Sequence, residues 1–215
     1  LIWNNDRAAF RAGYTTNHQW GDEKLGKYSV AFGENNTVQA SHGVSFGKEN
    51  TIASTATGSI ILGGKQNKIN DQSRMSSILS GEQNTIQNTS HSSIFNGNQN
   101  VIDATGTLNV IINGHNNRIH GNSNGSIILG GQNNTITGNY SLAFGQYTQI
   151  GTTDTPHHHS LIIGDGTCSQ SNPCKTSTSN QAVFYVSNGF GIGTANIRVN
   201  EQNKSHFDPF DPSIV

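Results

Sequence analysis

The chain has 215 residues with 12 basic and 13 acidic side chains, so its formal net charge is −1 at pH 7. Charged residues make up 12% of the sequence and hydrophobic residues 32%, and uncharged polar side chains, including 28 Asn, account for its polarity. This balance excludes the basic surface typical of nucleic-acid-binding proteins, and no apolar run reaches the roughly 20 residues of a membrane-spanning helix. We therefore expect no nucleic-acid partner and no membrane insertion by this segment. Because the chain begins at Leu1 rather than Met, we expect it to be a processed or excised piece.

Residues 1–27 precede the repetitive part of the chain and carry both tryptophans, Trp3 and Trp20. Phe10 adds further aromatic surface to this segment. The ends of a stacked repeat array need covering, and large aromatic side chains cover apolar surface well. We expect residues 1–27 to form an N-terminal cap that leads into the array.

Residues 28–166 repeat one pattern nine times, in units of 14 to 19 residues. In each full copy two or three apolar residues lead to a Gly, an Asn stands three positions later, and a Val or Ile follows two positions after that. The anchoring glycines are Gly33, Gly47, Gly64, Gly81, Gly97, Gly114, Gly131, Gly145 and Gly164. The Asn positions are Asn36, Asn50, Asn67, Asn84, Asn100, Asn117 and Asn134, with Thr148 in the eighth copy.

Each unit predicts two short strands and two turns. Apolar runs such as residues 59–62, bounded by Gly and Asn, are too short for helices, and second segments such as residues 134–137 alternate polar and apolar side chains. One such unit cannot bury its own apolar face, but stacked units can. We therefore predict an all-β fold: a parallel β-solenoid or β-roll of about nine 14–19-residue coils, with an N-terminal cap and a C-terminal β-hairpin.

The repeated Gly and Asn have expected structural roles. Sharp corners require positive φ, which Gly adopts freely and Asn more readily than most residues. Aligned Asn side chains can also hydrogen-bond from coil to coil in a ladder. The apolar residues before each Gly are expected to fill the core, namely Val30, Phe32, Ile61, Ile78, Phe95, Ile112, Ile128 and Phe144.

Three further segments follow the array. Residues 167–180 form a loop with Cys168 and Cys174; we favour a disulfide between them in an exported chain, and a free pair in a reducing compartment is the alternative. Residues 181–194 predict a strand, a tight turn and a second strand, the C-terminal hairpin. Residues 195–215 contain two Asp-Pro pairs and form either a disordered tail or an extended docking arm.

His157 and His159 are the candidate metal ligands. They share one face of an extended segment, and three copies around a trimer axis could hold an ion. We favour the alternative, a solvated insertion loop, and therefore predict no metal and no other cofactor. No Ser, His and Asp residues lie in a recognisable nucleophile motif, so we predict no catalytic residues and a non-enzymatic protein.

Two units carry a resemblance to a known family. Residues 28–33 (Tyr-Ser-Val-Ala-Phe-Gly) and 140–145 (Tyr-Ser-Leu-Ala-Phe-Gly) resemble the head repeat of YadA-like trimeric autotransporter adhesins. Residues 8–13 and the Gly-Phe-Gly-Ile-Gly-Thr of residues 189–194 are similar to elements that flank such repeats in bacterial surface and tail-fibre-like proteins. The resemblance implies a left-handed parallel β-roll, a homotrimer, and display outside a bacterial cell for attachment. In contrast to the family, 17-residue units predominate here and Asn-x-Ile replaces the small Ala-x-Gly turn.

The expected function is therefore structural and adhesive. We expect an extracellular or cell-surface bacterial module, a homotrimeric adhesin-like head whose partners are its own copies and host or matrix glycans or proteins. An alternative is a subunit of an extracellular filament joined end to end through the solenoid edges and the terminal arm. A further alternative is a carbohydrate-binding tail-fibre module. The sequence does not identify the residues that bind a partner.

Overall fold

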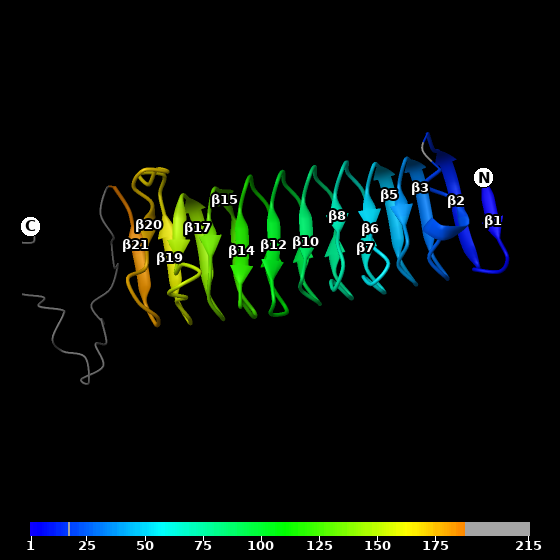
Figure 1. Cartoon of the computed structure of the whole chain (residues 1–215). Coiled ribbons are helices and arrows are strands. Elements are labelled where there is room, and N and C mark those ends of the chain that lie inside the picture. Colours follow the sequence, from blue (N-terminus) through cyan, green and yellow to red (C-terminus); the bar gives the residue numbers. More distant parts are fainter. Residues whose placement is uncertain (17, 188–215) are drawn as a thin grey trace, which may run out of the picture.

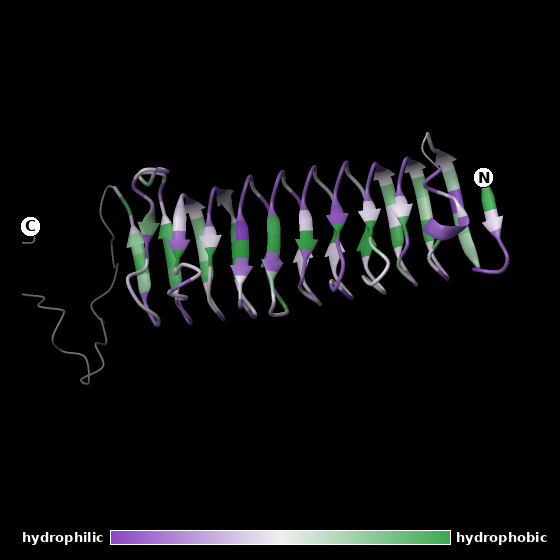
Figure 2. Cartoon of the chain, viewed as in Figure 1, coloured by the Kyte–Doolittle hydropathy of each residue, from purple (hydrophilic) through white to green (hydrophobic). Residues whose placement is uncertain are grey.

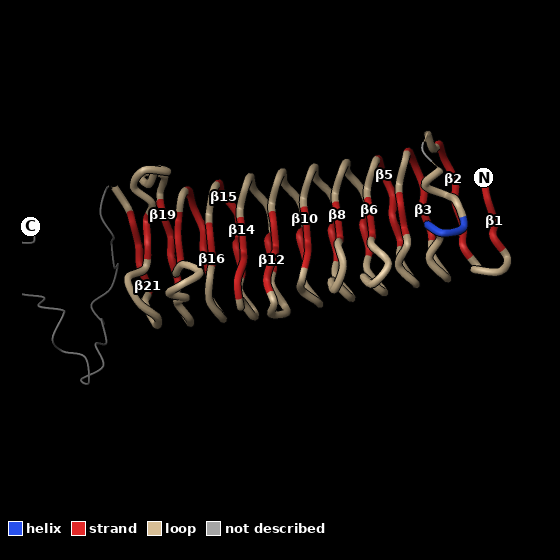
Figure 3. Tube along the Cα trace, viewed as in Figure 1, coloured by secondary structure: helices blue, strands red, loops and turns tan. Residues whose placement is uncertain are grey.

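Each repeat forms one coil with two short strands in the computed structural model, which describes residues 1–16 and 18–187. The coils stack into a long rod with the N-terminal strands at one end (Figure 1). Strands lie on two sides of the rod and loops join them at the corners (Figure 3). The predicted all-β parallel solenoid is confirmed.

The strands form two sheets, which we call sheet A and sheet B. Sheet A contains, in spatial order, β1 (Ile2–Asn4), β2 (Ala9–Tyr14), β3 (Val30–Glu34), β5 (Val44–Lys48), β7 (Ile60–Ile61), β9 (Ser77–Ile78), β11 (Ser93–Ile94), β13 (Val110–Ile111), β15 (Ile127–Gln132), β17 (Leu142–Gln146), β19 (Leu161–Gly164) and β21 (Ala182–Tyr185). Sheet B contains β4 (Thr37–Val38), β6 (Thr51–Ile52), β8 (Lys68–Ile69), β10 (Thr85–Gln87), β12 (Val101–Ala104), β14 (Arg118–Gly121), β16 (Thr135–Ile136), β18 (Thr148–Ile150) and β20 (Cys174–Lys175). A 3₁₀ turn, η1 (Asp22–Lys24), lies between β2 and β3 in the chain.

Both ends of the solenoid extend beyond the repeat pattern. At the N-terminal end, β2 pairs with β3 in parallel and β1 pairs with β2 in antiparallel. At the other end, β21 pairs with β19 in parallel and forms one more rung of sheet A. The second half of the predicted hairpin and the 195–215 tail lie outside the described residues.

The core consists of two columns of side chains, one from the centre of each sheet. Their register places equivalent residues directly above one another, as in the pairing of Ile86 with Ile69 and Ile102. The fully buried isoleucines are Ile61, Ile78, Ile94, Ile111, Ile128 and Ile162 from sheet A, and Ile52, Ile69, Ile86, Ile102, Ile119, Ile136 and Ile150 from sheet B. The rod therefore has a single narrow, continuous hydrophobic core.

The predicted core was only partly correct. Of its eight residues, Ile61, Ile78 and Ile128 are buried, Val30 and Phe32 are half-buried, and Phe95, Ile112 and Phe144 are exposed. Successive side chains of a strand point to opposite faces. In the run 93–95, Ile94 therefore faces the core and its neighbour Phe95 faces away from it.

The N-terminal end of the core contains a buried arginine. Arg11 occupies the same register position as Ala31 and is fully buried. Its guanidinium donates hydrogen bonds to the carbonyl oxygens of Ser29 and Val38, at 3.0 and 3.1 Å, and to the Ser29 hydroxyl at 2.8 Å. Burial lowers the pKa of Arg11 to about 10. Arg11 therefore links β2 to the following coil by hydrogen bonds.

The corners use positive φ at Gly, as predicted, but not at the repeated Asn. Gly97 has φ 110°, and a Cβ at this position would collide with the carbonyl oxygen of Gly114 in the next coil. The second left-handed position is the residue just before each repeated Asn, for example Gln99 with φ 57°. The expectation of positive φ at the repeated Asn residues was therefore wrong, because these residues are buried and hydrogen-bonded inside the corner.

The repeated Asn side chains form the predicted ladder. The Oδ1 atom of Asn100 accepts a hydrogen bond from the backbone N–H of Asn117, the equivalent residue one coil further on, at 3.0 Å. Its Nδ2 donates to the carbonyl oxygen of Gly114 in that next coil at 2.9 Å. The same bond to Oδ1 recurs from Asn36 through Asn134, and in the eighth copy the Thr148 backbone N–H donates it to Asn134. Each buried amide thus links two coils with both of its polar atoms.

A second ladder, which we did not predict, lies at the corner that leads into sheet A. The Ser76 backbone N–H donates to the Ser59 hydroxyl at 3.1 Å, and the Ser92 N–H donates to the Ser76 hydroxyl at 3.3 Å. The series continues with bonds to the side chains of Ser92, Asn109, Ser126, Ser141 and Ser160. A Ser or Asn two positions before the central buried residue of each strand from β7 to β19 in sheet A is the sequence signal that would have revealed it.

Replacing Asn100 with Ala should lower the free energy of unfolding by about 2–4 kcal/mol, since buried partners in two coils lose their hydrogen bonds. The matched control is Gln99→Asn, which keeps a residue suited to positive φ at an exposed position. We expect this control to stay within about 0.5 kcal/mol of the wild type. Denaturant unfolding followed by circular dichroism measures both, and equal stabilities of the two variants would contradict the assigned role of the ladder.

Candidate functional site

The outer face of sheet A is mostly apolar along the rod, apart from Ser77 and Ser93 and from Glu34 and Lys48 at the ends of β3 and β5. Two columns of side chains point outward on either side of the buried column, and neither contains a charged residue. The first column is half-buried and contains Val30, Val44, Ile60, Ser77, Ser93, Val110, Ile127, Leu142 and Leu161. The second contains Leu62, Leu79, Phe95, Ile112, Leu129 and Phe144, which are 37–53% exposed. Apolar residues recur in strand after strand in Figure 2.

Aromatic rings extend this face at the N-terminal end. Phe32 and Phe46 occupy the second column in adjacent strands, and their rings stack at 5.2 Å with planes 2° apart. Phe10 packs on Phe32, also at 5.2 Å between ring centroids. The strand pleat that buries the isoleucines thus places a second apolar surface on the outside of the same sheet.

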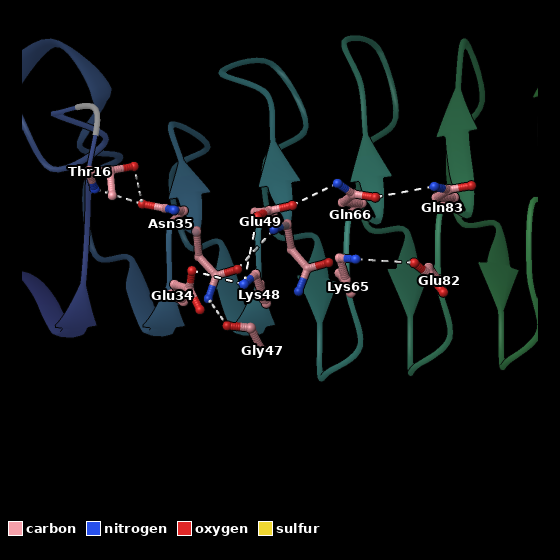
Figure 4. A network of polar contacts seen from close by, with 12 residues as sticks. Thr16, Glu34, Asn35, Gly47, Lys48, Glu49, Lys65, Gln66, Glu82 and Gln83 are labelled. Atoms are coloured by element: carbon pink, nitrogen blue, oxygen red, sulfur yellow. Dashed lines mark hydrogen bonds and ion pairs between the residues drawn. The ribbon is translucent and has the colours of Figure 1, made fainter.

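Sheet B, in contrast, carries polar side chains on its outer face. The residues with positive φ before each repeated Asn lie at the corner where each strand of sheet B begins. Several of their side chains are joined from coil to coil by hydrogen bonds (Figure 4). Gln66 Nε2 donates to Glu49 Oε2 at 2.7 Å, and Gln83 Nε2 donates to Gln66 Oε1 at 3.2 Å. Gln99 continues the series by donating to Gln83 at 3.0 Å. We call this series the outer amide ladder.

Ion pairs accompany the outer amide ladder. Lys48 lies 2.9 Å from Glu34, and Lys65 lies 3.5 Å from Glu82, each pair joining neighbouring coils (Figure 4). The hydrogen bond to Glu34 and the charge of that carboxylate raise the pKa of Lys48. All four side chains are well exposed, so the pairs contribute little to stability.

Two shallow grooves lie on sheet B. The upstream groove, of about 450 Å³, is lined by Glu49, Gln66, Lys68, Gln83 and Thr85. The downstream groove, of about 410 Å³, is lined by Asn116, Arg118, Asn133, Thr135, Tyr147, Thr148, Gln149, Gln170 and Pro173. Gln170 and Pro173 belong to the loop between the two cysteines, so this loop forms one wall of the downstream groove.

The cysteine loop is closed by the predicted disulfide. Cys168 and Cys174 are bonded, with their Cα atoms 5.3 Å apart, and both pack into the end of the core. Backbone hydrogen bonds between Ser169 and Asn172, at 3.1 and 3.2 Å, hold the loop between them. Because β20 begins at Cys174 and pairs with β18, the cross-link fixes the loop relative to sheet B.

The histidine cluster does not form a metal site among the described residues. His157 Nδ1 lies 2.6 Å from the Thr176 hydroxyl, and His159 stacks on Tyr140 at 5.5 Å between ring centroids. His158 Nδ1 accepts a hydrogen bond from the Asn139 backbone N–H at 3.0 Å. Neither here nor elsewhere in residues 1–16 and 18–187 do three or more His, Cys, Asp or Glu side chains converge as metal ligands would.

Comparisons with known proteins identify no relative of this chain: no family model, no curated protein and no solved structure matches it. Within the part of the chain that the structure describes, no helix has the length and apolar character needed to cross a membrane. The candidate sites therefore rest on the surface chemistry of sheets A and B.

Removing the disulfide with the double change Cys168→Ala and Cys174→Ala should destabilise the C-terminal end by about 2 kcal/mol, the chain-entropy value for so short a loop. Because coils of a solenoid open locally, hydrogen exchange should accelerate at β18 and β20 and stay unchanged at β8 and β10. Unchanged exchange at β18 in the double variant would contradict this role.

His120 should make stability depend on pH. Burial, followed by the charge of Arg118, lowers the pKa of His120 below its usual 6.5, and Asp103 partly offsets this. Because the pKa of His120 is lower in the folded state than in the unfolded state, protonation of His120 favours unfolding. Its contribution to the free energy of unfolding is therefore present above pH 6.5 and declines as the pH falls below that value. Denaturant unfolding of the wild type and of His120→Gln between pH 7.5 and 5 measures how much of the free energy of unfolding each protein loses on acidification. A wild-type loss on acidification no larger than that of the variant would contradict the assignment.

Proposed function

We propose that this chain is a non-enzymatic, extracellular β-solenoid module that assembles with its own copies through the outer face of sheet A and presents sheet B for surface attachment. The carrying observation is the pair of uncharged, mostly apolar columns on the outer face of sheet A, which Glu34 and Lys48 border at the ends of β3 and β5. At roughly 150–250 Å² for a large side chain, the six exposed residues of the second column present on the order of 500 Å². This area lies within the range of about 300–600 Å² for the largest apolar patch on a typical monomer, and such patches are often functional.

The first column enlarges this face. It adds roughly 300 Å², so a trimer interface that packs the first column of one rod against the second column of its neighbour would bury about 800 Å² in total, about half of a standard protein interface. A trimer fits two parallel columns, because three rods with sheet A toward a common axis can each pack one column against either neighbour. The resemblance to trimeric adhesin heads favours the same number of copies. The disulfide favours an oxidising compartment and thus a location outside the cytosol.

A second candidate is a filament subunit, favoured by the ends of the sheets. In the described residues, β21 and β20 are each paired on one side only, and an unpaired strand edge can accept another chain. Copies added at this end would extend the rod along its axis instead of side by side. The two candidates therefore differ in the shape and mass of the assembly.

Light scattering and negative-stain images of purified protein should show a uniform species of three chains. Phe95→Asp places a charge at the centre of the apolar face and should raise the dissociation constant of assembly at least 100-fold, because an unpaired charge would be buried. The matched control, Thr85→Asp, puts the same charge on the outer face of sheet B and should leave the trimer mass unchanged. A wild-type monomer, or a trimer that survives Phe95→Asp, would contradict lateral assembly. Long polymers of fixed width would favour the filament.

A further inference from the structure

We infer that the downstream groove of sheet B is a binding site for a neutral oligosaccharide. This inference rests on the proposed function, in which sheet A is covered by sister copies and sheet B stays accessible. The groove volume of about 410 Å³ lies within the range of small-ligand sites. Residues from several coils and from the disulfide loop form its walls.

The first argument is the chemistry of the lining. Asn116, Asn133, Gln149 and Gln170 supply amides, and Arg118 supplies a planar guanidinium. The amides donate and accept hydrogen bonds and the guanidinium donates them, which suits the vicinal hydroxyls of a sugar. Asn116 Nδ2 donates to Asn133 Oδ1 at 2.6 Å, which fixes the orientation of two of these amides before a ligand arrives.

Tyr147 supplies the apolar component. In the column of residues with positive φ, the two preceding coils carry Asn116 and Asn133, and the eighth copy carries Tyr147 instead, with φ 51°. Its ring packs partly against the core and also lines the groove beside Pro173. An aromatic ring with a polar hydroxyl can contact the C–H face of a sugar ring and hydrogen-bond at its edge.

The charge in the groove favours a neutral ligand. Arg118 is the charged side chain in the lining, and its Nη2 lies 3.3 Å from Asp103 Oδ2 on the adjacent strand. The nearby carboxylate offsets the positive charge that an acidic sugar would need. The guanidinium keeps further N–H donors for hydroxyl groups, since five are present and this pair uses one side of the fork.

The strand pairing argues against a peptide that binds by strand addition. The floor of the groove is formed by β14, β16 and β18, and each of these strands is paired on both sides. An extended peptide that binds a sheet adds to a free strand edge, and the floor offers none. The ligand must therefore be bound by side chains, which suits a compact polyhydroxylated molecule.

The upstream groove serves as a comparison, because it also lies on sheet B but lacks the features proposed for sugar binding. It has a similar volume, but in the outer amide ladder its Gln83 donates to Gln66, and Gln66 donates to Glu49. Its lining includes no aromatic ring and no residue of the cysteine loop. The aromatic ring and the cross-linked wall distinguish the downstream groove.

The test uses the purified full chain and four neutral tetrasaccharides, cellotetraose, maltotetraose, mannotetraose and fully N-acetylated chitotetraose, with a heparin tetrasaccharide as the acidic comparison. Isothermal titration should detect at least one neutral tetrasaccharide with a dissociation constant below about 1 mM, and weaker binding of the heparin fragment. Tyr147→Asn, which installs the residue of the preceding coil, should weaken that binding at least tenfold. The matched control Gln83→Asn in the upstream groove should bind as the wild type does.

Native mass and circular dichroism of each variant separate the two proposals. A variant Tyr147→Asn that keeps its fold and the wild-type mass but loses binding supports the site, and binding by a wild-type monomer would overturn the trimer while the site stands. Failure of all four neutral sugars, preference for the heparin fragment, or full binding by Tyr147→Asn would overturn the inference. Occupation of the groove by casein peptides in place of sugars would overturn it as well.

Discussion

The rest of this structure depends on one interaction, the buried Asn amide that joins each coil to the next. A coil of 14 to 19 residues with two strands of a few residues each cannot be stable alone. The side chain of Asn100 accepts from the backbone of Asn117 and donates to the carbonyl of Gly114, so one buried residue satisfies polar groups in the adjacent coil. Because the bond is repeated with little variation in distance, the coils keep a common register along the rod.

A constant register lets the two outer faces differ. The isoleucine columns fill the core, and the residues beside them in each strand point outward and are free to vary. On sheet A these positions are apolar over many coils, and on sheet B they are amides, hydroxyls and a few charges. The same scaffold therefore supports the two proposed activities, self-assembly on one face and ligand binding on the other, without any change in the core.

The repeat spacing was sufficient to predict much of this fold. Two strands per coil, parallel stacking and the Asn ladder follow from the fixed distance between Gly, Asn and Ile, and the disulfide follows from two cysteines close together in the chain. The assignment of Phe95 and Phe144 to the core failed for a local reason. An uninterrupted apolar run does not reveal which of two neighbours faces inward, and both alternatives bury one hydrophobic residue. The Ser ladder was missed because its members are common polar residues, and only their phase relative to the core identifies them.

The sequence by itself determined the length of the coils, the two strands in each and the Asn residues that link them, because these properties recur at fixed spacing in the chain, and its composition determined the low share of charged residues. The tertiary structure alone decided which apolar residues are exposed and which distant residues lie together. Arg118, Tyr147 and Gln170 are far apart in the chain, and they line one groove because stacking places successive coils in adjacent rungs and the disulfide holds the loop against sheet B. Which residues become neighbours depends on the register between stacked coils, and the sequence of a single repeat does not specify that register.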